Sequence, residues 1–350
     1  MKKIILIISL ILITVLTYLR LNYFKNEDST KNENEFEKLG YSEEEIEIIN
    51  TLQNPNIILN YDYDKLIIEI IKNENFKEEK LDEYLEFSKY NFSIQDTIYV
   101  VNNNFYNKDI EYNEDIIALM KEQYYINENL NRYIEYKKNN DLDNYDVILN
   151  VNCNLDYDFY TNTTPADLSK GTLILVNKFN YLDKNYVPEN MVTIESKYGV
   201  NQPLVSEVYE KYKLMWEDAS NNGLSLYINS PYRSYNTQNY LYNNYGKRDG
   251  YTLADTYSAR PGYSEHQTGL AFDVTSRTTN FDTFASSKEY EWLQDNAYKY
   301  GFILRYPKGK EYITGYQYES WHYRYVGIEV ATKIKELNIT YEEYYAYFIK

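Results

Sequence analysis

The sequence predicts an α+β fold for the C-terminal part of the chain, an all-helical region before it and a membrane-anchoring segment at the N-terminus. Apolar residues recur at intervals of three and four across residues 39–142, which is typical of amphipathic helices. From about residue 145, short β-branched runs alternate irregularly with helical stretches. Because these strands and helices follow no βαβ rhythm, a Rossmann-type sheet is not expected.

The first residues form an apolar segment with basic flanks. Lys2 and Lys3 precede Ile4 to Leu19, an uninterrupted run of apolar or hydroxyl residues. This run is short against the roughly 20 residues of a membrane span, and neither an Ala-x-Ala site nor a lipid-accepting cysteine follows it. We expect residues 1–24 to be an uncleaved signal anchor that places the rest of the chain outside the cell. A cleaved signal peptide is the alternative.

A polar, charged stretch over residues 25–38 predicts a linker. The helical region over 39–142 then begins with a capping box, in which Ser42 is the N-cap and Glu45 lies three residues later. Two stretches of this region resemble each other at an offset of 49 residues. We interpret them as two copies of a degenerate helix-pair repeat, with chance similarity as the alternative. The expected helices cover 64–72, 77–90, 114–122 and 128–138.

Residues 143–350 are expected to form the α+β domain. One helix is predicted over 203–221, and another begins at Ser286 with a capping box to Glu289 and stops at Gly301. The strand-like runs are 147–151, 173–176 and 224–228, each bounded by turn-forming residues.

Composition excludes some classes of function. The formal net charge is −17, so the chain repels phosphate backbones and a nucleic-acid partner is not expected. A single cysteine, Cys153, excludes an internal disulfide.

The two histidines of the chain both lie beside spaced carboxylates. His266 precedes Asp273 by seven residues, and His322 follows Glu319 by three. A catalytic zinc ion takes three protein ligands and leaves one position open. We therefore predict a metal site formed by His266, Asp273 and His322, with Glu319 as a base. A hydrogen-bonded or surface histidine is the alternative for either residue alone.

Local geometry sets conditions on this site. The run 269–274 alternates like a strand, which places Asp273 on the face opposite to Phe272. Positions three apart point to opposite faces of a regular strand, so Glu319 and His322 need a bend to share one site. Arg233 follows a strand end and could polarise a carbonyl group, with a surface salt bridge as the alternative.

Three motifs, in this order, resemble the VanY-type D-alanyl-D-alanine carboxypeptidase family of zinc peptidases. They are SPYRSYNTQ at 230–238, SARPGYSEHQTGLAFD at 258–273 and ESWHYRYVG at 319–327. The resemblance implies a small antiparallel sheet with flanking helices. It also implies one zinc ion held by His266, Asp273 and His322, with Glu319 as the catalytic base. It further implies that Arg233 steadies the developing oxyanion, and that Gln238 and Ser264 line the substrate pocket together with Arg233.

The resemblance leads us to expect a membrane-anchored zinc carboxypeptidase. Its expected reaction is the removal of the C-terminal D-alanine from peptidoglycan stem peptides outside the cell. Activity as an L,D-carboxypeptidase on tetrapeptide stems is one alternative. A catalytically idle cell-wall-binding protein is the other.

Overall fold

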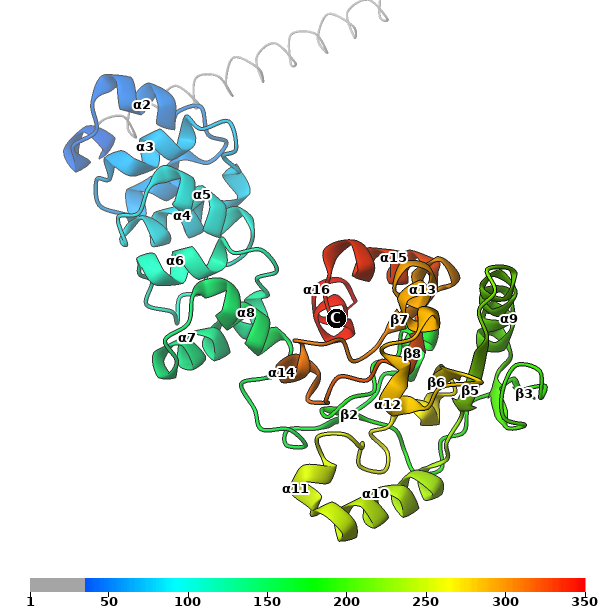
Figure 1. The fold of residues 1–350 in the computed structure, drawn as a ribbon. Coiled ribbons are helices and arrows are strands. Elements are labelled where there is room, and N and C mark those ends of the chain that lie inside the picture. Colours follow the sequence, from blue (N-terminus) through cyan, green and yellow to red (C-terminus); the bar gives the residue numbers. More distant parts are fainter. Residues whose placement is uncertain (1–34, 350) are drawn as a thin grey trace, which may run out of the picture. The chain divides into compact units, whose positions relative to one another are not determined.

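The computed structural model describes residues 35–349 (Figure 1). The predicted signal anchor, 1–24, and most of the predicted linker lie outside the described residues. Within 35–349, no helix combines the length and the apolar character needed to cross a membrane. Contacts divide the chain into two compact units, Met1–Asn127 and Glu128–Lys350.

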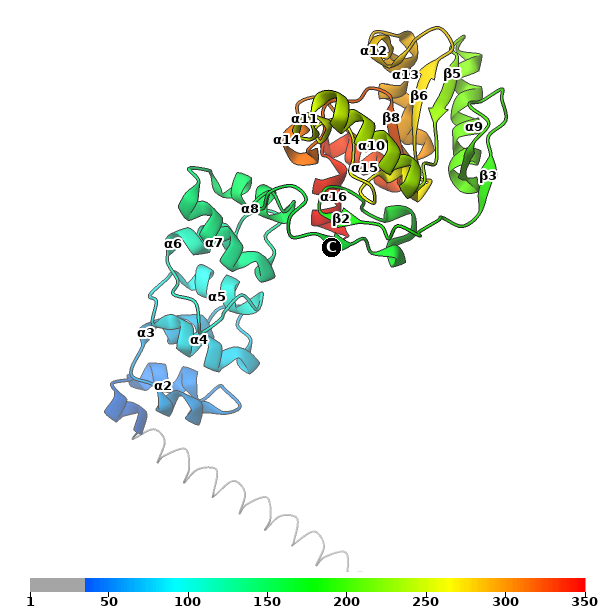
Figure 2. The same cartoon turned by 90° about the horizontal axis from the view of Figure 1, so that it is seen from below.

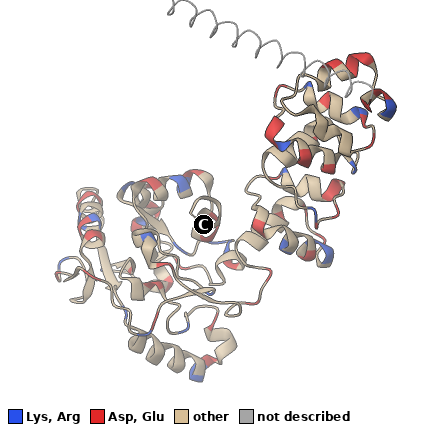
Figure 3. Cartoon of the chain, turned by 180° about the vertical axis from the view of Figure 1, so that it is seen from behind, with Lys and Arg blue, Asp and Glu red and all other residues tan. Residues whose placement is uncertain are grey.

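The first unit is all-helical, as predicted. The capping box at its start is confirmed, because Ser42 N–H donates to Glu45 Oε2 (2.8 Å) and Glu45 N–H donates to Ser42 Oγ (3.4 Å). Acidic side chains are spread over its helices (Figure 3), which is typical of solvated helix faces. Its helices are α2 (Glu43–Ile49), η1 (Pro55–Asn60), α3 (Lys65–Ile71), η2 (Glu78–Lys80), α4 (Leu81–Ser88), α5 (Ile94–Asn102) and α6 (Glu114–Met120).

The structure supports the predicted repeat and extends it. The N-caps of α3 and α6, Asp64 and Asn113, are 49 residues apart, and each side chain accepts a backbone N–H. The 3₁₀ turns η2 and η3 (Asn127–Asn129) and the helices α4 and α7 (Leu130–Asn139) start at the same offset. A third helix closes each copy, α5 in one and α8 (Asn144–Asn152) in the other. The repeat therefore has three helices, where the sequence pattern predicted a pair.

Two of the three predicted early strands are wrong. Residues 147–151 lie in α8, which begins after Asp143 because this side chain accepts the N–H of Asp146. Residues 174–176 are buried but join no sheet, and Leu173 ends the 3₁₀ helix η4 (Leu168–Leu173). Short buried apolar runs have the same period-free pattern in helices and strands, which explains the error. The domain boundary between residues 142 and 143 falls just before α8 and stays a prediction.

A four-stranded sheet lies at the centre of the second unit, in the order β5-β6-β8-β7, with all neighbours antiparallel. This arrangement confirms the α+β class and the small antiparallel sheet. Its strands are β5 (Leu226–Ser230), β6 (Ala271–Ser276), β7 (Phe302–Leu304) and β8 (His322–Tyr325). Two smaller pairs accompany it, β1 (Thr164–Pro165) with β2 (Asn180–Tyr181), and β3 (Met191–Thr193) with β4 (Pro203–Val205).

Helices flank this sheet. The predicted helix 203–221 is β4 followed by α9 (Ser206–Asn221), which runs alongside β5 in both views (Figures 1 and 2). The cap predicted at Ser286 lies one residue later, because Ser287 accepts the N–H of Tyr290. The remaining helices are α10 (Tyr235–Asp249), α11 (Tyr251–Ala254), η5 (Glu265–Thr268), α12 (Phe281–Phe284), α13 (Lys288–Asn296), η6 (Ala297–Tyr300), α14 (Glu311–Thr314), α15 (Ile328–Leu337) and α16 (Tyr341–Phe348).

Phe272 on β6 lies in the centre of the main core. It is fully buried, and its ring packs edge-on against Tyr212 on α9 and beside Phe302 on β7, both with centroids 5.2 Å apart. The predicted alternation is confirmed, because Phe272 and Val274 enter this core while Asp273 faces the other way. The strand that carries Asp273 is therefore fixed by its apolar face.

Replacing Phe272 by alanine should lower the free energy of unfolding by about 3–5 kcal/mol, because a large buried ring is lost and a cavity remains. Urea denaturation followed by circular dichroism measures this change. The control is Leu214→Ala on α9, whose side chain is 52% exposed and should change stability by no more than about 0.5 kcal/mol. Equal losses for both variants would place the core elsewhere.

Candidate metal centre

Strands β6 and β8 bring Asp273 and His322 together. The two residues are direct register partners in the antiparallel ladder, so their side chains leave the sheet on the same face. Oδ1 of Asp273 lies 3.1 Å from Nδ1 of His322.

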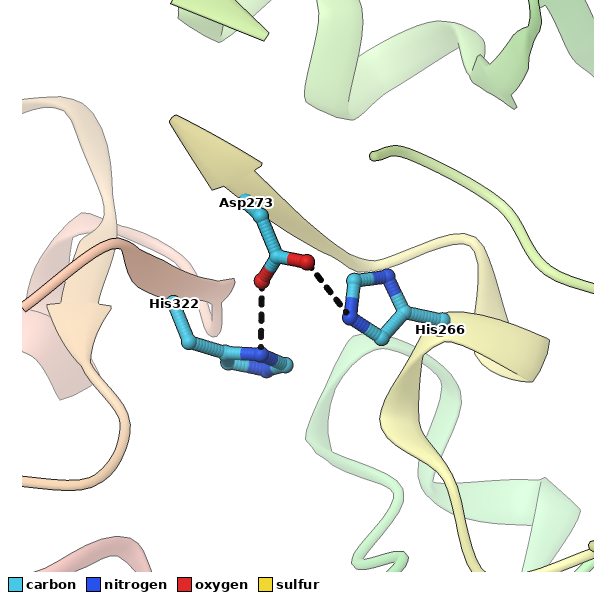
Figure 4. Close-up of side chains that lie close together, drawn as sticks. All are labelled: His266, Asp273 and His322. Atoms are coloured by element: carbon cyan, nitrogen blue, oxygen red, sulfur yellow. Dashed lines mark ion pairs between the residues drawn. The ribbon is translucent and has the colours of Figure 1, made fainter. Parts of the chain in front are cut away.

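His266 reaches the same point from η5, just before β6. Its Nε2 lies 3.4 Å from Oδ2 of Asp273, so the carboxylate lies between the two imidazoles (Figure 4). One ligand atom from each of the three residues lies within 4.8 Å of the others. The predicted ligand set is thus gathered in one place, and all three side chains are buried.

Gly269 makes the return from η5 to β6 possible. It adopts a left-handed conformation (φ +65°), and a Cβ atom there would approach a side-chain carbon of Val205 to 2.8 Å. Only glycine meets both conditions without strain. The short loop between His266 and Asp273 therefore folds back so that both face one point.

The outer nitrogen of each imidazole has an acceptor nearby. Nδ1 of His266 lies 2.7 Å from the carbonyl oxygen of Pro231. Nε2 of His322 lies 3.5 Å from Oε2 of Glu265. Acceptors at these positions favour a proton on each outer nitrogen. The inner nitrogens, Nε2 of His266 and Nδ1 of His322, are then free to bind a cation.

The electrostatics of the cluster also fit a cation. Burial opposes charge on His322, but Asp273 and Glu265 raise its pKa to about 9. Burial likewise opposes charge on Asp273, yet His266 and His322 hold the pKa of this carboxyl well below its usual range. Oδ1 of Asp273 is buried and accepts no hydrogen bond from any residue within 35–349. Two imidazole nitrogens and one carboxylate oxygen match the donor set of a catalytic zinc ion.

Glu319 lies beside this cluster at the entrance to β8. A turn between Glu319 and His322, closed by a 3.5 Å hydrogen bond from His322 N–H to the carbonyl of Glu319, supplies the expected bend. Oε2 of Glu319 consequently lies 3.5 Å from Nδ1 of His322. Burial raises the pKa of Glu319 to about 8, so this carboxyl is poised for proton exchange near neutral pH.

The cluster opens into a pocket of about 670 Å³. Arg233 lines it and is only partly exposed, with Nη2 3.6 Å from Oδ2 of Asp273. Ser230 Oγ and Gln238 Oε1 accept from the guanidinium at 2.8 and 2.7 Å. The arginine is therefore held toward the metal cluster and is not part of a surface salt bridge.

The two other predicted pocket residues also line this cavity. Ser264 immediately precedes η5 and is buried. Gln238 is almost fully buried, and its Nε2 donates to the carbonyl of Ala259 (2.7 Å). Because its amide oxygen accepts from Arg233, Gln238 is placed to orient the arginine.

Sequence reasoning missed a buried ion network behind the cluster. Glu265 accepts hydrogen bonds from Arg305 (2.8 Å) and Arg324 (2.7 Å), and Arg305 also donates to Glu342 (2.6 and 2.8 Å). Glu265 and Arg324 lie next to or two residues from predicted ligands, a signal that could have found them. Arg305 and Glu342 lie outside all three motifs.

Comparisons with known proteins agree with these motifs. The family model described as VanY, D-alanyl-D-alanine carboxypeptidase, matches residues 201–328. A putative carboxypeptidase of Bacillus subtilis, YodJ, is 42% identical over 49% of this chain and 66% of its own length. A bifunctional D-Ala-D-Ala dipeptidase and carboxypeptidase of Enterococcus gallinarum, VanXYC, is 35% identical over 50% of this chain and 94% of its own length.

A solved structure of the LdcB LD-carboxypeptidase shares 38% identity with this chain. The match has a TM-score of 0.51 and covers 53% of this chain and 91% of that one. The chain spans about two thirds or less of the two curated relatives with the strongest matches, 66% of the Bacillus subtilis protein and 60% of a D-alanyl-D-alanine carboxypeptidase of Enterococcus faecium.

Proposed function

Because the chain belongs to the VanY family of D-alanyl-D-alanine carboxypeptidases, we propose that it is a zinc-dependent carboxypeptidase. Its proposed reaction is removal of the C-terminal D-alanine from peptidoglycan stem peptides. The observation that carries this proposal is the meeting of His266, Asp273 and His322 within 4.8 Å at the base of a pocket. An idle wall-binding protein has no need to retain this donor set together with Glu319.

The proposed roles follow from position. His266 Nε2, a carboxylate oxygen of Asp273 and His322 Nδ1 would hold zinc, which supplies a Lewis acid that polarises the scissile carbonyl and lowers the pKa of water. Glu319 takes a proton from the attacking water and delivers it to the leaving amine of D-alanine. Arg233, fixed by Ser230 and Gln238, donates hydrogen bonds to the oxyanion that develops on the carbonyl.

The cellular location is part of the proposal. Residues 1–24 act as a signal anchor, with a cleaved signal peptide as the alternative, and place the described residues on the extracellular side of the membrane. Residues 25–38 serve as a linker, and 39–142 space the peptidase domain, 143–350, from the membrane. The apolar run with its preceding lysines supports this location, as does a substrate that lies in the cell wall.

A second candidate is L,D-carboxypeptidase activity on tetrapeptide stems. It is favoured by the likeness to the LdcB LD-carboxypeptidase structure. Relatives named D-alanyl-D-alanine carboxypeptidases favour the first candidate. Both reactions release D-alanine and use the same cluster, so the choice depends on the residue before the cleaved bond.

Incubation of the full-length, zinc-loaded protein with a stem pentapeptide and, separately, with a tetrapeptide distinguishes these reactions. We expect D-alanine release from the pentapeptide at the higher kcat/KM, measured by chromatography of the products. Faster cleavage of the tetrapeptide would establish the L,D reaction. If neither peptide is cleaved while zinc is bound, the proposed enzyme activity is wrong and the binding-protein alternative takes its place.

A further inference from the structure

Glu265 divides its two carboxylate oxygens between different partners. Oε1 accepts hydrogen bonds from Nε of Arg305 (2.8 Å) and Nη1 of Arg324 (2.7 Å). Oε2 accepts none from any described residue and instead lies 3.5 Å from Nε2 of His322. One oxygen thus fixes the side chain, and the other faces the outer edge of a proposed zinc ligand.

The residues around Glu265 keep it charged in a dry environment. Arg305 and Arg324 are both 0% exposed, and Glu265 is 1% exposed. Burial works against ionisation, but the two guanidinium groups hold the pKa of Glu265 well below its usual range. Arg324 is in turn fixed by the carbonyl oxygens of Thr172 (2.9 Å) and Ile174 (2.7 Å).

Arg305 connects this carboxylate to the C-terminal helix. Its Nη1 and Nη2 form a two-pronged ion pair with Glu342 on α16, at 2.8 and 2.6 Å. A buried guanidinium with only one carboxylate partner would carry an unbalanced charge at high cost. Glu342 therefore balances the second arginine and fixes the guanidinium whose Nε contacts Glu265.

We propose that Glu265 is a positioning residue for the metal site, held in place by Glu342 of α16 through Arg305. Its Oε2 accepts the Nε2–H of His322, which fixes the ring so that Nδ1 faces Asp273 and the proposed zinc ion. A carboxylate behind a ligating histidine orients the ring and raises its basicity. The inference rests on the proposed zinc function and adds that the C-terminal helix contributes to metal affinity.

Zinc affinity of the full-length protein tests this role. Glu265→Gln keeps the shape of the side chain and removes its charge, and should raise the zinc dissociation constant by about 10–100-fold in competition with a chelator of known affinity. Glu342→Gln should raise it by a smaller factor. The matched control is Glu343→Gln, the next residue on α16, which is equally buried but pairs with Lys310 and Thr340. It should leave zinc affinity unchanged even if stability falls.

A second readout follows the ring of His322 itself. The chain has two histidines, so ¹⁵N-histidine labelling gives two imidazoles to assign. In the zinc-loaded protein, His322 should carry its proton on Nε2, and this proton should exchange with solvent faster in Glu265→Gln than in Glu343→Gln. A purely structural loss of stability would affect both variants alike.

Wild-type affinity in Glu265→Gln, or an equal loss in Glu343→Gln, would overturn the positioning role. If Glu265→Gln fails to fold, Glu342→Gln decides, because zinc binding no weaker than in Glu343→Gln would also overturn it. Failure of the proposed function looks different. In that case the unmodified protein itself binds no zinc, or binds zinc and cleaves neither peptide.

Discussion

Replacing Glu319 by glutamine is expected to lower kcat by about 10²–10⁴-fold, the usual contribution of a general base, while zinc remains bound. The amide keeps the size of the side chain but cannot take a proton from water. Glu319 lies 3.5 Å from Nδ1 of His322 and outside the three-residue cluster, so its loss should leave the metal site complete. Steady-state kinetics on the pentapeptide and zinc content of the same sample measure both effects.

The control for this variant is Glu329→Gln, an exposed glutamate on α15, which should retain full activity and full zinc. A Glu319→Gln protein that loses zinc would make this residue a metal ligand. One that binds zinc and remains fully active would remove Glu319 from the reaction.

Replacing Asp273 by alanine should have the opposite pattern, with zinc and activity lost together. The change removes the one anionic member of the ligand cluster, whose carboxylate lies within 3.4 Å of both imidazoles. We expect zinc affinity to fall by more than 100-fold, beyond the range typical of an outer partner of a ligand. Chelator competition measures the affinity, and added zinc should restore part of the activity.

Circular dichroism and urea denaturation of Asp273→Ala give the necessary control for folding. The neighbouring Phe272 and Val274 still fill the core in this variant, so the strand should remain in place. A folded Asp273→Ala protein with wild-type zinc affinity would show that the metal is held elsewhere.

The cluster could be predicted from sequence because its residues stand in short, chemically unusual segments. His266 and Asp273 are joined by one loop with a glycine at its end, and the alternation of β6 places Asp273 opposite the core. The bend that aligns Glu319 with His322 could be stated as a condition. The turn that provides it depends on packing outside the motif, including the hydrogen bond from Glu319 N–H to the carbonyl of Tyr306 (3.1 Å).

The surrounding structure was less predictable for physical reasons. The run 147–151 is buried on most sides, so its apolar pattern carries no period that separates strand from helix. The third helix of each repeat escaped notice because its offset is 50 residues and not 49. Arg305 and Glu342 meet only in the folded chain, and no local pattern announces a buried ion pair between distant positions.

Zinc content of the purified full-length protein, measured by elemental analysis after removal of loosely bound metal, tests the central claim most directly. We predict one zinc ion per chain in the unmodified protein and in Glu319→Gln, and almost none in Asp273→Ala. Stoichiometric zinc that persists in folded Asp273→Ala, or its absence from undamaged wild-type protein, would contradict the assignment of this cluster as a zinc site.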